Sequence, residues 1–270
     1  MSRSAAITGV GMGLVALVGL SAAAAQNVPV LNNAVVVNVC EPITIAIGDM
    51  SGYGWDIPGF MGEDLLIRDG QTWAQFWAQH TSNIIPPPPL PPVDFSRYVV
   101  IAAIQGHQST GGMAAIYITG IRHWPSPTPP DRAAATVMIV DDERPGMLDV
   151  ITNPFHIVMV ARACLPPNGS VTFRHQAPAA GTGIVRGHVF GRESNSTDWQ
   201  PLFGATVRLG QAAGTPGSVT RTGLDGSYFF VNVAPETYVL SASFPGYQSQ
   251  TVTITVRPDA RTGHQFFLIP

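Results

Sequence analysis

The chain of 270 residues contains no lysine, since all 14 of its basic residues are arginine. A lysine nucleophile, a Schiff base and a Lys–Asn isopeptide crosslink are therefore excluded. Charged residues make up only 11% of the chain, and the formal net charge is -3. This balance lacks the basic character with which proteins bind nucleic acid, so we expect no nucleic-acid partner.

Motifs for catalysis and metal binding are also missing. The seven histidines never occur at the H-x-H or H-E-x-x-H spacing of a zinc site, and no cysteine lies near one in sequence. No G-x-S-x-G elbow is present. We predict no catalytic residue, no metal ligand and no cofactor. An enzyme whose site is assembled across a domain interface stays open as a hypothesis.

The first 25 residues carry the pattern of a secretory signal peptide. Arg3 precedes an apolar run over residues 5–20, and small residues then predict cleavage between Ala25 and Gln26. The alternative is an uncleaved membrane anchor, since the run is nearly long enough to span a bilayer. The pattern predicts a secreted or periplasmic protein with no stable membrane insertion after cleavage.

Cysteine is scarce, and its two positions are informative. Cys40 precedes the first predicted strand of a domain, and Cys164 ends the last one. Disulfides persist in exported proteins, so we predict a bridge between Cys40 and Cys164 that joins the two ends of one sheet. Two separate buried thiols are the alternative.

One short helix is predicted in the first domain, which we place at residues 35–164. Spacing of i, i+3, i+4 and i+7 puts four rings on one helical face, and Asp69 precedes them as a candidate N-cap. These rings belong to Trp73, Phe76, Trp77 and His80. The proline run at residues 86–92 either stiffens a surface loop or forms an exposed polyproline II ligand for an aromatic groove.

Strands are predicted around this helix from alternating apolar residues. They are placed at residues 43–48, 98–104, 113–121, 135–140 and 154–164. The acidic run from Asp141 to Glu143 is interpreted as a solvated strand end, with a calcium site as the alternative. These elements predict an α+β domain with one mixed or antiparallel sheet.

A family resemblance covers roughly residues 42–163. The order W-x-x-F-W-x-x-H, V-D-F-S-R-Y-V-V-I, G-x-x-x-T-G-G and N-P-F-x-I-V resembles the C-terminal domain of the protease-complex subunit PrcB. The resemblance implies a small α+β domain in an exported, non-catalytic partner of a secreted protease.

The last part of the chain, residues 184–270, shows strands and turns only, which predicts an all-β sandwich. Residues 165–183, rich in Pro, Gly and Ser, are interpreted as a linker. The pair Asp225-Gly226 predicts a tight hairpin, because Gly readily adopts positive φ. On the following strand Phe229 faces away from its two aromatic neighbours.

The string T-x-x-D-G-x-Y-x-F, followed by Y-x-L and P-G-Y, resembles the carboxypeptidase regulatory-like domain over residues 184–268. The resemblance implies a sandwich of transthyretin-like type. Such domains are accessory modules of secreted and surface proteins and carry no catalytic residues of their own.

These features predict an exported accessory protein, not an enzyme, that binds another exported protein and stabilises a secreted protease or an envelope complex. The rival hypothesis is a carbohydrate partner, because Trp199 lies in a loop where its ring can be exposed. Phe229 and Tyr247, if they face solvent, can also stack on a sugar or a protein. We take Trp199, Phe229 and Tyr247 as the candidate binding surface.

Overall fold

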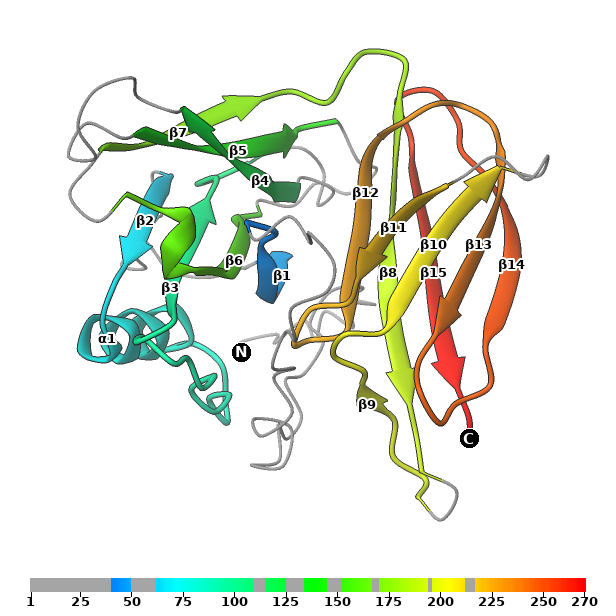
Figure 1. Ribbon diagram of the computed structural model, residues 1–270, viewed down its shortest axis with the longest axis horizontal. Coiled ribbons are helices and arrows are strands. Elements are labelled where there is room, and N and C mark those ends of the chain that lie inside the picture. The colour runs from blue at the N-terminus through cyan, green and yellow to red at the C-terminus, as the bar shows by residue number, and fades with distance from the viewer. Residues whose placement is uncertain are drawn as a thin grey trace, which may run out of the picture.

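The computed structural model shows a mostly β protein with one short α-helix and several sheets (Figure 1). It describes residues 40–49, 62–108, 115–124, 134–144, 152–166, 170–193, 196–211 and 217–270. The predicted signal peptide and its cleavage point at Ala25 and Gln26 lie outside these residues. No helix in the described ranges is long and apolar enough to cross a membrane.

The first domain is built on an antiparallel sheet of order β1-β6-β3-β2, here called the β3 sheet. Its strands are β1 (Ile43–Asp49), β2 (Glu63–Ile67), β3 (Tyr98–Ile104) and β6 (Pro154–Ala161). The central strand β3 is buried on both faces: the apolar residues 99–103 all have 0% exposure. The predicted strands at 43–48 and 98–104 are confirmed.

The helix α1 (Gly70–His80) covers one face of the β3 sheet. Asp69 caps it as predicted, since its carboxylate accepts the backbone N–H of Thr72 at 2.9 Å. The predicted apolar face is also confirmed: Trp73, Phe76 and Trp77 are buried against the sheet. Amphipathic spacing thus sets both the position of the helix and its orientation.

A second sheet, the β5 sheet, covers the opposite face of the β3 sheet. It has the order β4-β5-β7, with β5 and β7 parallel. Its strands are β4 (Ala115–Trp124), β5 (Ala134–Asp142) and β7 (Ser170–Gln176). The first domain therefore contains two sheets where the sequence predicted one.

Strand β7 corrects the interpretation of residues 165–183 as a linker. Its Val171 and Phe173 alternate with polar residues and pack onto the core between the two sheets. The Pro, Gly and Ser content of the flanking residues favoured a linker. Residues 170–176 nevertheless form a strand, which pairs in parallel with β5.

The C-terminal part is a sandwich of two sheets, as predicted. The β8 sheet has the order β12-β8-β15, with β9 on β8, and the β10 sheet has the order β11-β10-β13-β14. A shared apolar core that includes Val189, Leu240 and Phe266 lies between them. The strands are β8 (Gly183–Gly191), β9 (Gln200–Pro201), β10 (Thr206–Gln211), β11 (Ser218–Arg221), β12 (Ser227–Val233), β13 (Thr237–Ser243), β14 (Gln250–Thr255) and β15 (Arg261–Leu268).

The two cysteines lie together at one end of the β3 sheet. Cys164 ends a short 3-10 helix, η3 (Arg162–Cys164), that follows β6, and Cys40 precedes the neighbouring strand β1. Burial raises the pKa of the Cys164 thiol, and a hydrogen bond with the Cys40 side chain adds to this. The two side chains are thus in contact, and the disulfide itself stays a prediction.

Candidate binding surface and domain junction

The Asp225-Gly226 turn joins the two domains. Gly226 has the predicted positive φ, at +76°. The turn does not close a hairpin, however, because β11 before it and β12 after it belong to different sheets. Instead it contacts the first domain, where the backbone N–H of Leu224 donates to the carbonyl of Thr44 in β1 at 2.8 Å.

The Asp225 carboxylate is buried at this contact, with 5% exposure. It accepts the backbone N–H and the hydroxyl of Ser227 at 2.9 and 2.6 Å, and the backbone N–H of Ile47 in β1 at 3.2 Å. Burial raises the pKa of Asp225, and these hydrogen bonds oppose that rise. A side chain of the sandwich therefore satisfies a backbone donor on the edge of the β3 sheet.

Phe229 packs between the domains, so the condition under which it was a candidate for the binding surface, exposure of its ring to solvent, is not met. Its ring centroid lies 4.9 Å from that of Tyr117 in β4 and 5.4 Å from that of His156 in β6. Ile47 and Val140 of the first domain belong to the same apolar cluster. Strand alternation placed Phe229 on the outer face of the β8 sheet, and the first domain covers that part of the face.

His156 lies under Phe229 and connects three strands. The backbone N–H of Ile118 donates to its Nδ1 at 2.8 Å, so the ring proton is on Nε2, which faces the Thr44 hydroxyl at 3.0 Å. The residue is fully buried, and burial lowers its pKa to about 3. The ring is therefore neutral at physiological pH.

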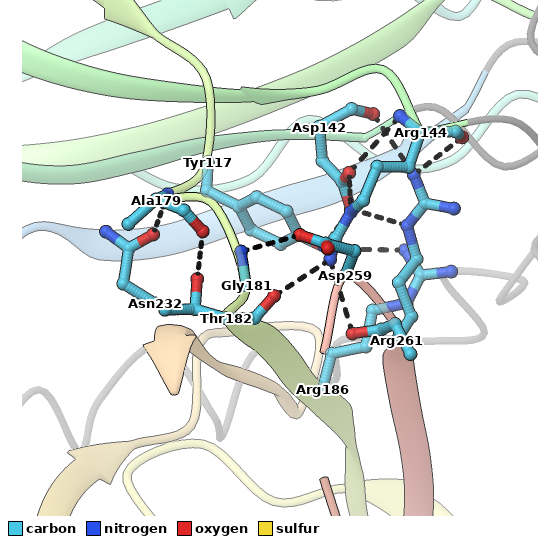
Figure 2. Close-up of polar contacts among 11 residues, drawn as sticks. Tyr117, Asp142, Arg144, Ala179, Gly181, Thr182, Arg186, Asn232, Asp259 and Arg261 are labelled. Atoms are coloured by element: carbon cyan, nitrogen blue, oxygen red, sulfur yellow. Dashed lines mark hydrogen bonds and ion pairs between the residues drawn. The ribbon is translucent and has the colours of Figure 1, made fainter. Parts of the chain in front are cut away.

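A buried ion cluster forms a second contact between the domains (Figure 2). Asp142 at the end of β5 is fully buried and pairs with Arg144 at 2.6 Å and with Arg261 of β15 at 2.5 Å. Burial would raise the pKa of Asp142, but the hydrogen bonds and charges of both arginines hold it below its ordinary value. The interpretation of residues 141–143 as a solvated strand end is therefore wrong at Asp142.

Backbone contacts around the cluster hold the connection between β7 and β8 in place. Arg144 also donates to the carbonyl of Thr182, and Asp259 accepts the backbone N–H of Gly181 at 2.9 Å (Figure 2). In the described part of the chain, no group of three or more His, Cys, Asp or Glu side chains has the geometry of a metal site. Of the acidic run, Asp142 serves the junction, whereas Asp141 pairs with His175 of β7 at 2.9 Å.

The other half of the outer face of the β8 sheet carries an aromatic surface, defined here as Phe190, Arg192, Trp199 and Phe267. Phe190 and Phe267 are partners in the parallel β8–β15 pair, and their rings stack at 5.5 Å with an interplanar angle of 19°. The rings of Trp199 and Phe267 form a T-shaped pair, with centroids 5.0 Å apart and an interplanar angle of 73°. The guanidinium of Arg192 lies 4.8 Å from the centroid of the Trp199 ring.

This surface is partly open to solvent. Phe267 is 39% exposed, and the neighbouring Ile269 is 41% exposed. Trp199, Phe190 and Arg192 are half-buried. An exposed, mutually packed group of aromatic and arginine side chains is typical of an interaction site.

Part of the chain matches a known protein family. Residues 184–268 match the family model of the carboxypeptidase regulatory-like domain. No curated protein matches the chain. The transthyretin-like type and the resemblance of residues 42–163 to PrcB remain predictions.

Similar solved structures are remote. The minor pilin of Streptococcus agalactiae has a TM-score of 0.30 and 14% identity, covering 48% of this chain and 67% of that one. A putative carbohydrate binding protein from Pseudomonas aeruginosa has a TM-score of 0.25 and 16% identity, covering 33% and 89%. The pilus adhesin of Streptococcus pneumoniae has a TM-score of 0.21 and 16% identity, covering 41% and 20%. At these TM-scores the similarities carry no argument about function.

Within the regulatory-like domain, only Trp199 of the three predicted surface residues belongs to the aromatic surface. Tyr247 is half-buried, packs against the sandwich core and lies 5.7 Å from Phe244. Sequence reasoning missed Phe190, Arg192 and Phe267. Their signal was alternation: residues 190 and 192 flank Gly191, and Phe267 lies between the buried Phe266 and Leu268.

Proposed function

We propose that this protein is an exported accessory protein that works by binding protein at the aromatic surface and carries out no catalysis itself. One observation carries the proposal. The first domain covers one half of the outer face of the β8 sheet through Phe229, whereas the other half presents Phe267 at 39% exposure beside Trp199 and Arg192. Aromatic and arginine side chains dominate the centres of protein interfaces.

The arrangement of the rings favours a protein partner over a carbohydrate. A sugar stacks on an open ring face, but Arg192 covers one face of Trp199, and Phe267 packs against the same ring at an interplanar angle of 73°. Phe267 is inclined to Trp199 by 73° and Phe190 is within 19° of parallel to Phe267, so neither ring is coplanar with Trp199. Carbohydrate binding is kept as the second candidate because Trp199 is half-buried on a surface.

The sequence supports the location, the partner class and the non-catalytic role in this proposal. The pattern of residues 1–25 supports export, and the resemblance to PrcB supports a secreted protease or an envelope complex as the partner. The lack of nucleophile and metal motifs supports a role without catalysis.

The test is capture of a partner from the native envelope with matched variants. Phe267→Ser removes the most exposed ring of the aromatic surface, and Val219→Ser removes a side chain of 48% exposure on β11, outside that surface. We expect wild type and Val219→Ser to retain a stoichiometric partner and Phe267→Ser to lose it. Equal recovery by all three would contradict the proposal.

Two further measurements separate the alternatives. Binding on a glycan array that disappears in Trp199→Ala would favour the carbohydrate hypothesis. Turnover of casein or chromogenic esters that follows the purified protein would show that the protein is an enzyme.

A further inference from the structure

The proline run forms a preorganised strap on α1. We call residues 85–92 the proline strap. The indole N–H of Trp73 donates to the carbonyl of Pro91 at 2.9 Å, and that of Trp77 donates to the carbonyl of Pro88 at 3.2 Å. The two carbonyls are three residues apart, which is one turn of a polyproline II helix. Two tryptophans one helical turn apart on α1 therefore fix the strap at Pro88 and Pro91.

The outer side of the strap is apolar and open. Ile85 is 93% exposed and Leu90 is 45% exposed. Pro91 is buried and Pro88 half-buried, whereas Pro89 between them is exposed. The strap is thus anchored to α1 at Pro88 and Pro91, while Ile85 and Leu90 leave apolar surface open beside the helix. A segment already fixed at two points loses less entropy on binding than a free one.

The aromatic surface has the chemistry that binds such a strap. Polyproline II segments bind between aromatic rings, and in this chain Trp73 and Trp77 already donate indole N–H groups to proline carbonyls. The indole N–H of Trp199 has no hydrogen-bond acceptor among the described residues, so it remains available to a proline carbonyl on another molecule.

The charges beside the two elements are also complementary. Arg192 on the aromatic surface makes no ion pair within the described ranges of the chain. Asp94 follows the strap, is exposed, and is held by the backbone N–H and hydroxyl of Ser96 at 2.9 and 2.6 Å. A strap lying across the aromatic surface can place this carboxylate near the Arg192 guanidinium, which lies over the Trp199 ring.

We propose that the aromatic surface binds the proline strap of a second copy of this chain, so that copies assemble head to tail. This inference rests on the proposed function, because it names the partner of the same surface. The chain cannot fill its own surface, since α1 and the C-terminal end of β15 lie on opposite sides of the molecule (Figure 1). Each copy then offers one strap and one surface, which is a heterologous interface.

Sedimentation velocity over a concentration series tests the assembly. We expect the average mass of the wild type to rise with concentration, and a free peptide of the sequence IIPPPPLPPV, residues 84–93, to reverse that rise. Leu90→Glu and Phe267→Ser should each weaken self-association by about tenfold or more. Val219→Ser, the control outside both elements, should associate like the wild type.

Mixing the two defective variants distinguishes this interface from others. Leu90→Glu keeps an intact aromatic surface and Phe267→Ser keeps an intact strap, so their mixture should form a one-to-one dimer that grows no further. Trp199→Phe, which keeps an aromatic ring but lacks the indole N–H, should weaken assembly while leaving the thermal midpoint unchanged. If a variant fails to fold, the inference is tested by whether the free peptide of residues 84–93 reverses self-association of the wild type.

A wild type that stays monomeric at all concentrations, or a mixture that forms no dimer, would overturn the inference. So would a peptide that binds while the wild type stays monomeric, because a foreign proline-rich segment would then be the ligand. If the wild type is monomeric but Phe267→Ser still loses an envelope partner, head-to-tail assembly is wrong and the proposed function stands.

Discussion

At the scale of single residues, three buried polar side chains, Asp142, Asp225 and His156, lie at contacts between sheets and domains. Asp142, which is fully buried, has two arginine partners, and one of them lies 119 residues away in sequence. Asp225 accepts three hydrogen bonds, and His156 uses both ring nitrogens. Because an unpaired buried charge is costly, these partners explain how such groups are tolerated inside an otherwise apolar interior.

His156 predicts a pH dependence of stability. Its folded pKa of about 3 lies below the ordinary histidine value of 6.5, so between these two pH values the unfolded chain binds a proton that the folded chain excludes. Stability should therefore fall as pH is lowered through this window, by up to ~1.4 kcal/mol per pH unit for this residue. His80, with a pKa lowered by burial to about 4, acts in the same direction.

Urea denaturation at pH 7 and pH 5 measures this effect. His156→Gln offers one acceptor and one donor but does not titrate, so its stability should depend less steeply on pH than that of the wild type. An unchanged slope in the variant would show that His156 does not control the acid sensitivity.

At the scale of elements, the turn before β12 holds the sandwich against the first domain. Substitution of a glycine in this turn, compared with a glycine outside it, tests this role. A Cβ at Gly223 would lie 2.5 Å from Cβ of Thr44 in β1. Gly223→Ala should therefore force the turn away from the first domain and cost about 1–3 kcal/mol. At Gly210 in β10 the nearest atom to a Cβ is 3.9 Å away, so Gly210→Ala should change stability by less than ~0.5 kcal/mol.

Thermal melting and limited proteolysis of the two glycine variants would check this prediction. We expect Gly223→Ala to expose new cleavage sites near β1 and the turn, and Gly210→Ala to behave like the wild type. Equal stability of the two variants would contradict a docking role for the turn.

At the scale of the whole molecule, the junction predicts that both domains unfold together. The apolar cluster around Phe229, the Asp225 turn and the Asp142 cluster all join the first domain to the sandwich. Calorimetry should therefore show one transition. Reduction of the predicted Cys40–Cys164 bridge should lower its midpoint, since closing so long a loop stabilises by ~4 kcal/mol on the chain-entropy model.

Alkylation without reductant provides the control, because bridged thiols should not react. Two transitions, of which only one shifts on reduction, would show that the domains unfold independently. Full labelling of both cysteines in the unreduced protein would show that the bridge is absent.

The sequence by itself determined the elements whose cause is local. The helix at Gly70–His80 formed with its predicted cap, and β3 has its predicted bounds at Tyr98–Ile104. The sandwich and its family also followed from strand alternation and turn motifs over residues 184–268. Capping, amphipathic spacing and turn chemistry act between near neighbours in the chain, so a single sequence records them.

Only the tertiary structure decided which outward-facing groups are covered. Phe229 and Phe267 both lie on the outer face of the β8 sheet, yet the first domain covers one and leaves the other 39% exposed. Likewise the sequence predicted a solvated strand end at Asp142, which Arg261 of β15 covers in the structure. The sequence also predicted a linker at residues 170–176, which pair with β5 as a strand. Exposure and pairing depend on contacts between segments far apart in the chain, and local patterns carry no record of those contacts.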